Sequence, residues 1–291
     1  MRVTAAVLVV SFIVVAVLAS TPFGVWIVFD VIGEDEPKPL PAIEGPLVID
    51  GPLERTRQLL LPAAIEQPSG ISTVGDEFLL ATDQAEFFRI TRDGSIIEEA
   101  ALLEGLLLRR QGRVEAIASH KGTIHVAGEL GFVAQFDQQS GLKPAAVAEN
   151  LTAMDISGLT NHNGQLLGVN DETFAIINLT AGEVIQLDPG ERLKPGRSIS
   201  ELHLSGIASD GIRLFLVAEN CSTVVVISGE SLEVEGVYGI DEIDAQDMAV
   251  AGGELWVVVD HNLFDERPPM FLYAVPDPVS ADPVTGLPLG I

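Results

Sequence analysis

The chain has 291 residues, 47% of them hydrophobic, and a formal net charge of −26 at pH 7. This hydrophobic content supports a folded core and excludes general disorder. The acidic balance repels nucleic acid and attracts cations, so nucleic-acid binding is excluded as a function class. The single cysteine, Cys221, excludes an intramolecular disulfide.

The first segment of the chain is apolar. No charged residue occurs from Val3 to Phe29, a run of 27 residues. About 20 apolar residues suffice to span a bilayer as a helix. We therefore predict that residues 1–32 form a transmembrane anchor, in preference to a signal segment cleaved near Ser20. Arg2 precedes the run and acids follow it, which favours an N-terminus inside the cytoplasm and the remaining chain outside it.

Residues 33–50 contain four prolines with acids between them, namely Pro37, Pro39, Pro41 and Pro46. Such a composition cannot form a helix or a central strand, so we predict an extended linker. A folded domain is expected over residues 51–277. The Pro/Gly-rich residues 278–291 are expected to form a tail.

From Glu66 onward the sequence repeats with a period of about 44 residues. The residues that open the repeats are Ser69, Glu115, Ser157, Ser205 and Asp247. A turn glycine follows six or seven residues later, at Gly75, Gly122, Gly164, Gly211 and Gly253. An apolar strand then runs into an acid, at Asp83, Glu129, Asp171, Glu219 and Asp260. Two further strands per repeat give four short strands, the signature of a β-propeller blade rather than of a β-sandwich.

The fifth repeat lacks a fourth strand, because the chain becomes proline-rich at Pro276. The run from Arg55 to Leu61 is strand-like and has no place in the first repeat. We therefore predict an all-β, five-bladed propeller that this N-terminal strand closes by completing the last blade. Such closure pairs the two ends of the ring and removes open edges.

The start of the first strand and the end of the second meet at one mouth of the propeller. The opening residues are thus expected to form an inner ring, and the five acids an outer ring. Beside them we expect Asp155, Glu172, Asn220, His261 and Asn262. Carboxylates that face one narrow mouth repel each other unless a cation or protonation neutralises them. Hard oxygen ligands suit Ca²⁺ or Mg²⁺, and we predict a Ca²⁺ site.

Glu115 and Asp247 replace serine in the inner ring, and departures from a repeat are where a function can be added. We predict these two residues as metal ligands. As ligand-binding residues we predict the outer ring and one histidine, namely Asp83, Glu129, Asp171, Glu219, Asp260 and His261. The alternative for the outer ring is structural, with each acid accepting backbone N–H bonds between adjacent blades.

Catalytic motifs are absent from the sequence. It contains no Gly-x-Ser-x-Gly elbow, no phosphate loop and no His-Glu-x-x-His. His203 and His261 are the histidines placed to reach the mouth, and an Asp260/His261 pair could serve acid–base chemistry. Loop hydrogen bonding is the alternative for that pair.

The repeat resembles the SdiA-regulated family of bacterial propellers. The residues that carry the resemblance are Pro68-Ser69-Gly70-Ile71 with Thr82-Asp83-Gln84, Ser157-Gly158-Leu159 with Asn170-Asp171-Glu172, and Val114-Glu115-Ala116-Ile117. The resemblance implies a five-bladed propeller on a single-pass anchor in the bacterial inner (plasma) membrane, with its domain in the periplasm or otherwise outside the cytoplasm. NHL-repeat and esterase-like phytase propellers look related, although the chain lacks the Lys and Arg cluster expected of a phytase mouth.

We therefore expect a membrane-anchored, divalent-cation-binding module that presents a surface to a protein or a small molecule. The alternative is a calcium-dependent hydrolase of phosphoesters or lactones that uses Glu115, Asp247 and His261. A structural interaction protein without metal is a third possibility. We favour the binding module over the enzyme.

Overall fold

The computed structural model describes residues 44–101, 113–128, 132–137, 144–148, 155–241, 244–259 and 268–276. All of them belong to one compact unit, Ala42–Ile291. Within these ranges no helix combines the length and the apolar character that a membrane crossing requires. The predicted anchor at residues 1–32 and the predicted tail at residues 278–291 lie outside the described residues.

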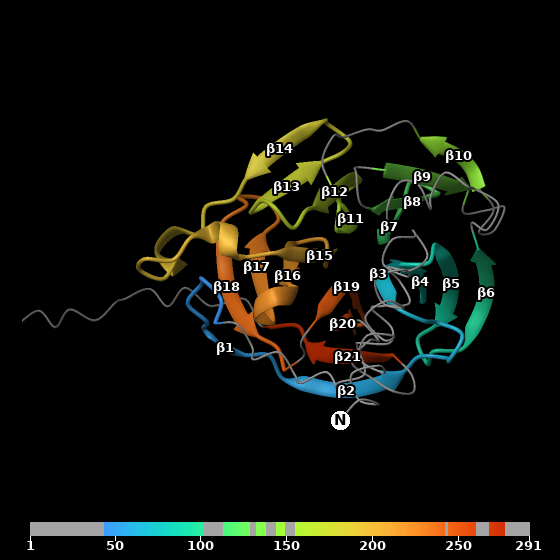
Figure 1. Ribbon diagram of the computed structural model, residues 1–291, viewed down its shortest axis with the longest axis horizontal. Helices are drawn as coiled ribbons and strands as arrows, with labels where there is room; N and C mark the ends of the chain where they lie inside the picture. Colours follow the sequence, from blue (N-terminus) through green and yellow to red (C-terminus); the bar gives the residue numbers. More distant parts are fainter. Residues whose placement is uncertain are drawn as a thin grey trace, which may run out of the picture. The chain divides into compact units, whose positions relative to one another are not determined.

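The strands form five sheets of antiparallel repeat strands (Figure 1). Blade 1 contains β3 (Pro68–Val74), β4 (Glu77–Thr82), β5 (Glu86–Thr91) and β6 (Ile96–Ala101). Blade 2 contains β7 (Val114–His120), β8 (Thr123–Gly128), β9 (Phe132–Asp137) and β10 (Pro144–Ala148). Blade 3 contains β11 (Gly158–His162), β12 (Gln165–Val169), β13 (Ala175–Asn178) and β14 (Glu183–Gln186).

The last two blades each recruit a strand from the N-terminal side of the domain. Blade 4 contains β15 (Leu204–Ser209), β16 (Arg213–Ala218), β17 (Thr223–Ser228) and β18 (Val234–Gly239), with β1 (Gly51–Pro52) at its edge. Blade 5 contains β19 (Ala245–Ala251), β20 (Glu254–Val259), β21 (Pro269–Ala274) and β2 (Arg55–Leu60). In the described residues, short 3-10 helices lie at Gly190–Arg192, Ile199–Glu201 and Glu219–Cys221.

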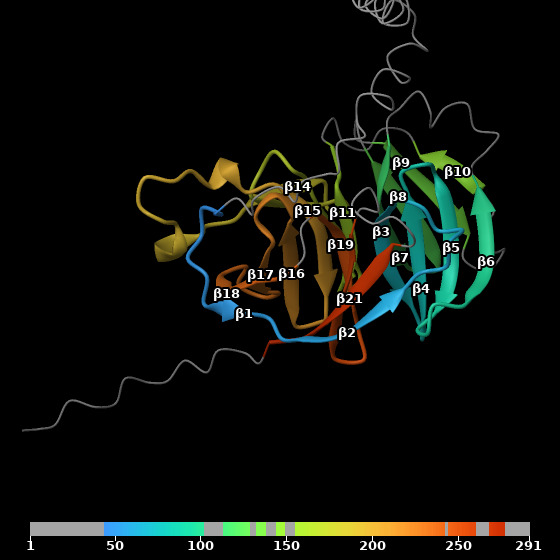
Figure 2. The ribbon, with the colours of Figure 1, turned by 60° about the horizontal axis from the view of Figure 1, so that its bottom comes forward.

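The first strands of the blades surround a common centre. β3, β7, β11, β15 and β19 pack each against the next, and β19 packs against β3 to complete the ring (Figure 1; Figure 2). Apolar residues from facing blades fill the spaces between the sheets in separate clusters. The predicted five-bladed propeller is therefore confirmed.

The predicted ring closure is also confirmed. β2 pairs antiparallel with β21, with Gln58 opposite Phe271 and Leu60 opposite Pro269. Leu61, which follows β2, is fully buried in the cluster between blades 5 and 1. The strand thus joins the two ends of the repeat array through a backbone ladder and through apolar packing.

Residues 44–50, which the sequence assigned to the linker, pack against the domain. Leu47 is buried in the cluster shared by blades 3 and 4, and it forms an isolated bridge with Leu193. The Asp50 carboxylate accepts a hydrogen bond from the Val237 amide. β1 then adds to the outer side of β18 in parallel. An extended proline-containing segment can pack in this way because one edge of it needs no partner.

Candidate functional site

Two positions of every repeat meet at one mouth of the propeller, because the first two strands of a blade are antiparallel neighbours. In the described residues this mouth contains a cavity of about 200 Å³. Its lining consists of Asp83, Arg113, Glu115, Asp155, Ser157, Asp171, Ser205, Glu219 and Gln246. The fold therefore brings together four of the predicted site residues, namely Asp83, Glu115, Asp171 and Glu219.

The remaining predicted site residues are placed differently. Glu129, Asp260 and His261 lie outside the described residues. Asp247 is described, but it is not among the residues that line the mouth cavity. The predicted roles of all eight residues as ligands stay predictions.

The electrostatics of the mouth centre on Glu219. Burial raises the pKa of this carboxyl, and the negative charges of Asp244 and Asp171 raise it further. The charges of His203 and Arg113 act in the opposite direction and lower this pKa. A positive charge added to the cavity would oppose the same repulsion, so the mouth favours a cationic ligand.

The basic groups in this region are few. Arg113 forms an ion pair with Asp83 at 3.3 Å, and its guanidinium side chain is 61% exposed. Gln246 Nε2 lies 3.5 Å from Glu219 Oε2, at the outer limit of a hydrogen bond. Against five lining carboxylates, one guanidinium leaves the cavity strongly acidic.

The inner-ring serines connect neighbouring blades. The hydroxyl of Ser69 donates to the Val114 carbonyl at 2.7 Å. The hydroxyls of Ser157 and Ser205 donate in the same way to carbonyls of the next blade, at Leu204 and Ala245, over 2.7 and 2.6 Å. The serine at these repeat openings is thus explained by a hydrogen bond between first strands, a role that the sequence analysis did not assign.

Asp247 connects three blades. Its side chain is fully buried, and its two carboxylate oxygens accept hydrogen bonds from the amides of Ile71 in blade 1 and Ile207 in blade 4. The distances are 2.9 and 3.2 Å. Burial raises the pKa of this carboxyl well above its usual range, although the backbone donors oppose that shift. The structural role considered for the outer ring is therefore observed here in the inner ring.

Glycine after the opening residue allows the first strands to approach. A Cβ atom built at Gly206 would lie 2.4 Å from Asp247 Oδ1, and one at Gly158 would lie 2.6 Å from the Gly206 Cα. Neither contact is compatible with a side chain. The Ser-Gly pair of the repeat thus serves lateral packing of the ring.

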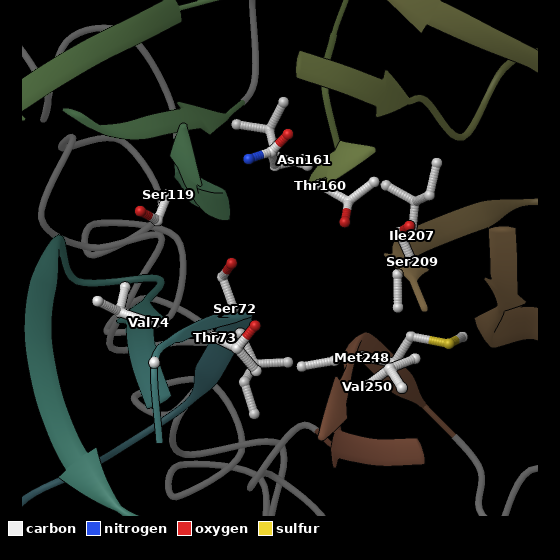
Figure 3. Close-up of a pocket in the computed structure, with 15 residues that line it drawn as sticks. Ser72, Thr73, Val74, Ser119, Thr160, Asn161, Ile207, Ser209, Met248 and Val250 are labelled. Atoms are coloured by element: carbon white, nitrogen blue, oxygen red, sulfur yellow. The ribbon is translucent and has the colours of Figure 1, made fainter. Parts of the chain in front are cut away.

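The central channel holds a second cavity of about 260 Å³, to which all five first strands contribute. Figure 3 shows Ser72, Ser119, Thr160 and Asn161 around it, together with aliphatic side chains. None of the described residues that line it is charged. The charge that could attract a cation is therefore concentrated at the mouth rather than along the channel.

The donor atoms at the mouth are carboxylate, hydroxyl and amide oxygens, which fit Ca²⁺ and not zinc. Across the parts of the chain that the structure describes, no three His, Cys, Asp or Glu side chains converge as a metal centre. A Ca²⁺ ion would therefore have to complete its shell with water or with a ligand. The Ca²⁺ site stays a prediction.

The sequence analysis expected Asp155 beside the mouth and His203 within reach of it, but it did not recognise that both occupy one repeat position, two residues before each opening. That position is occupied by Gln67, Arg113, Asp155, His203 and Ala245. Arg113 and Asp155 line the cavity, and the charge of His203 lowers the pKa of Glu219. The signal was present in the repeat, because this is a second position that varies between blades. Its side chains give the mouth its mixed chemistry.

Fold and site together define a five-bladed β-propeller with an acidic mouth. No protein-family profile matches the sequence, and no curated protein matches it either. Among solved structures, the chain is similar to the glutaminyl cyclase of Myxococcus xanthus, with a TM-score of 0.55 and 15% identity. That similarity covers 77% of this chain and 100% of the cyclase.

Two further solved structures are less similar. The PQQ-bound aldose sugar dehydrogenase of Streptomyces coelicolor matches with a TM-score of 0.46 and 11% identity, over 76% of this chain and 97% of that chain. A streptogramin B lyase matches with a TM-score of 0.41 and 15% identity, over 76% of this chain and 73% of that chain. At these identities the cyclase supports the propeller fold alone, and the other two structures add no argument.

Proposed function

We propose that this protein is a ligand-binding propeller whose acidic mouth takes a divalent cation, with Ca²⁺ as the ion of choice. The observation that supports this proposal is the cavity of about 200 Å³ lined by Asp83, Glu115, Asp155, Asp171 and Glu219. A doubly charged ion offsets the repulsion among these carboxylates and finds oxygen ligands of the type it prefers. The bound ion then presents open coordination positions to a small molecule or to a partner protein.

The raised pKa of Glu219 gives this proposal a direction with pH. A proton and a cation compete for the same carboxyl, so Ca²⁺ affinity increases as the pH rises through the pKa of Glu219. Protons are released on binding at pH values near that pKa. Both effects are measurable by calorimetry in buffers of different ionisation enthalpy.

The setting of the module rests on the N-terminal sequence and on the family resemblance. The uncharged run from Val3 to Phe29 has the length of a membrane anchor. With Arg2 on the cytoplasmic side, the propeller would lie in the periplasm or otherwise outside the cytoplasm. We propose an SdiA-regulated type of membrane-anchored propeller on these grounds.

A calcium-dependent hydrolase of phosphoesters or lactones is the second candidate. It is favoured by one observation, the position of the exposed His203: its amide donates to Oδ1 of Asn220 at 3.4 Å, and Asn220 follows Glu219 in the chain. A histidine and a carboxyl with a raised pKa beside a metal could exchange protons with a substrate or with water. His261 and Asp260 would extend this group.

Calorimetric titration of the full chain in detergent micelles with Ca²⁺ tests the first proposal. We expect heat of binding in the parent and a strong loss in Asp171→Asn/Glu219→Gln. The control Glu66→Gln/Asp76→Asn removes two exposed acids outside the mouth and should bind as the parent does. Absence of heat, together with an unchanged melting temperature, would exclude the cation site.

Two additional measurements separate the remaining alternatives. If the variant Glu115→Gln/Asp247→Asn binds Ca²⁺ as tightly as the parent, these two residues are not ligands of the cation. Hydrolysis of 4-nitrophenyl phosphate or of an aliphatic lactone that needs both Ca²⁺ and His203 would favour the enzyme. Binding of Ca²⁺ without any such turnover would favour the module.

A further inference from the structure

The outer edge of blade 3 differs from that of blade 4. In blade 4 the last strand, β18, is covered by β1, whereas β14 is the outermost strand of blade 3 among the described residues. The Leu187 amide donates to the Phe174 carbonyl, and Ile176 stands opposite Ile185. Because such pairs alternate along an antiparallel ladder, the amide and carbonyl of Val184 and Gln186 point away from β13. Blade 3 therefore offers donors and acceptors for an added strand.

A groove of about 800 Å³ lies beside this edge. Its walls come from the end of β14, from residues 188–192, from the start of β18 and from the segment that carries Val48 and Asp50. Ile185, Leu232 and Val234 are half-buried there and give it an aliphatic floor. The exposed Val184, with 46% of its surface accessible, adds apolar area on the other face of β14.

The rim of the groove is acidic. Asp188, Glu191 and Glu233 line it and are exposed. Arg192, the guanidinium among the described residues that line the groove, forms an ion pair with Asp50 and donates to the Glu235 carbonyl at 2.9 Å. The positive charge is thus engaged within the protein, and the exposed charges of the groove are negative. Charge complementarity favours a basic occupant.

We propose that this groove binds an extended, basic segment of a partner protein, which adds to β14 as a fifth strand of blade 3. Main-chain hydrogen bonds to Val184 and Gln186 would hold the segment, its aliphatic side chains would cover the half-buried floor, and its Lys or Arg side chains would meet the rim. Strand addition at a free sheet edge is an established mode of peptide recognition. β1 on blade 4 shows that this propeller accepts a fifth strand.

The surface is distinct from the acidic mouth. The mouth cavity and the groove share no lining residue. The groove can therefore function with or without a cation at the mouth, and each proposal can fail separately.

Fluorescence anisotropy with the full chain in detergent micelles tests the groove. The probe is a labelled peptide of about eight residues with alternating Val and Lys, a length that matches a short strand. One comparison peptide alternates Val and Glu, and a second Val–Lys peptide is N-methylated at alternate positions on its pairing edge. We expect binding of the first peptide alone, because the others lack the complementary charge or the backbone donors.

Two pairs of variants localise the binding. Val184→Pro removes an outward N–H and should weaken the Val–Lys peptide at least about fivefold, whereas Val184→Thr keeps that N–H and should bind nearly as the parent does. Glu191→Lys/Glu233→Lys should also weaken binding. The control Glu66→Lys/Asp76→Lys, on exposed residues just before β3 and in the turn after it, should not. The melting temperature of each variant, compared with that of the parent, verifies that the fold is retained.

Several results would overturn the proposal. The first is that the Val–Lys peptide does not bind the parent. The second is that folded Val184→Pro binds this peptide as tightly as the parent does. The third is that the charge reversals in the groove and those in the control weaken peptide binding equally. Self-association of the parent that Glu191→Lys/Glu233→Lys abolishes would assign the groove to a second copy of this chain instead. Sedimentation velocity measures that outcome directly.

Discussion

Asp247 is predicted to stabilise the closed ring, because its carboxylate joins blade 5 to blades 1 and 4. Asp247→Ala would leave the buried amides of Ile71 and Ile207 without their acceptors. A buried donor without a partner costs about 1–3 kcal/mol, so loss of both bonds predicts a decrease of about 2–6 kcal/mol in the free energy of unfolding.

The conservative variant Asp247→Asn should lower the free energy of unfolding by less than Asp247→Ala does. Asp247→Asn keeps one acceptor oxygen, but its amide group then faces the second backbone N–H. It also removes the desolvation cost that raises the pKa of the Asp247 carboxyl. These effects partly cancel, and we expect the free energy of unfolding to decrease by about 1–3 kcal/mol. Ser205→Ala, which removes the hydroxyl that donates to the Ala245 carbonyl, is the reference and should lower the free energy of unfolding by about 1 kcal/mol.

Guanidinium chloride unfolding of the full chain in micelles, followed by tryptophan fluorescence, measures these differences. Trp256 is buried in the cluster between blades 5 and 1 and therefore reports on the ring at Asp247. An Asp247→Ala variant within about 0.5 kcal/mol of the parent would refute the structural role, because such a change is typical of a surface substitution. Unchanged stability of Asp247→Asn with loss of Ca²⁺ binding would identify Asp247 as a metal ligand instead.

Three further predictions concern the stability of the propeller. Burial, with the nearby His120, lowers the pKa of His125 to about 4. His125 therefore protonates more readily in the unfolded chain, and stability should fall as the pH drops from about 6.5 to about 4, by about 2 kcal/mol after allowance for solvent screening. His125→Leu should reduce this loss when melting temperatures at pH 7 and pH 5 are compared. Leu47→Ala should cost about 2–4 kcal/mol in denaturant unfolding, because Leu47 is 2% exposed in the cluster of blades 3 and 4. Gly206→Ala should destabilise by more than about 2 kcal/mol, since its Cβ would overlap Asp247, and a smaller effect would contradict the close approach of the strands.

Much of the fold could be predicted from local patterns. The turn glycines Gly75, Gly122, Gly164, Gly211 and Gly253 all have positive φ, as a hairpin turn between short strands requires. Their recurrence six or seven residues after the repeat openings predicted the number of blades. The missing strand of the fifth repeat and the unassigned run at Arg55 predicted the closure. Strand period and turn chemistry are encoded within a few residues, so no knowledge of distant contacts was needed.

Part of the mouth could be predicted for the same reason. Asp83, Glu115, Asp171 and Glu219 line one cavity because equivalent positions of antiparallel repeat strands meet at one end of a propeller. The repeat offset carries this information without any side-chain detail. Asp155 and His203 were expected at the mouth as well, whereas Arg113, which occupies the same repeat position, was missed and would have been found by comparing the repeats two residues earlier.

Other features depended on contacts between residues distant in the sequence. Ser69, Ser157 and Ser205 donate to carbonyls 40 to 47 residues away, and Asp247 accepts from Ile71 across 176 residues. Because Asp247 is acidic, the sequence analysis predicted it as a metal ligand. In the structure it is buried between three blades, and its carboxylate oxygens accept hydrogen bonds from backbone amides. Side-chain orientation in the ring follows from how closely neighbouring first strands approach, and a repeat pattern does not contain that distance.

In the N-terminal segment, too, the sequence determined one feature and the tertiary structure another. Its prolines correctly excluded a helix at residues 44–50, but they could not reveal that Leu47 enters the core or that β1 covers blade 4. An extended chain can lie in solvent or on a surface with the same backbone angles. Only the apolar cluster of blades 3 and 4, assembled from sequence far downstream, determines which of the two is stable.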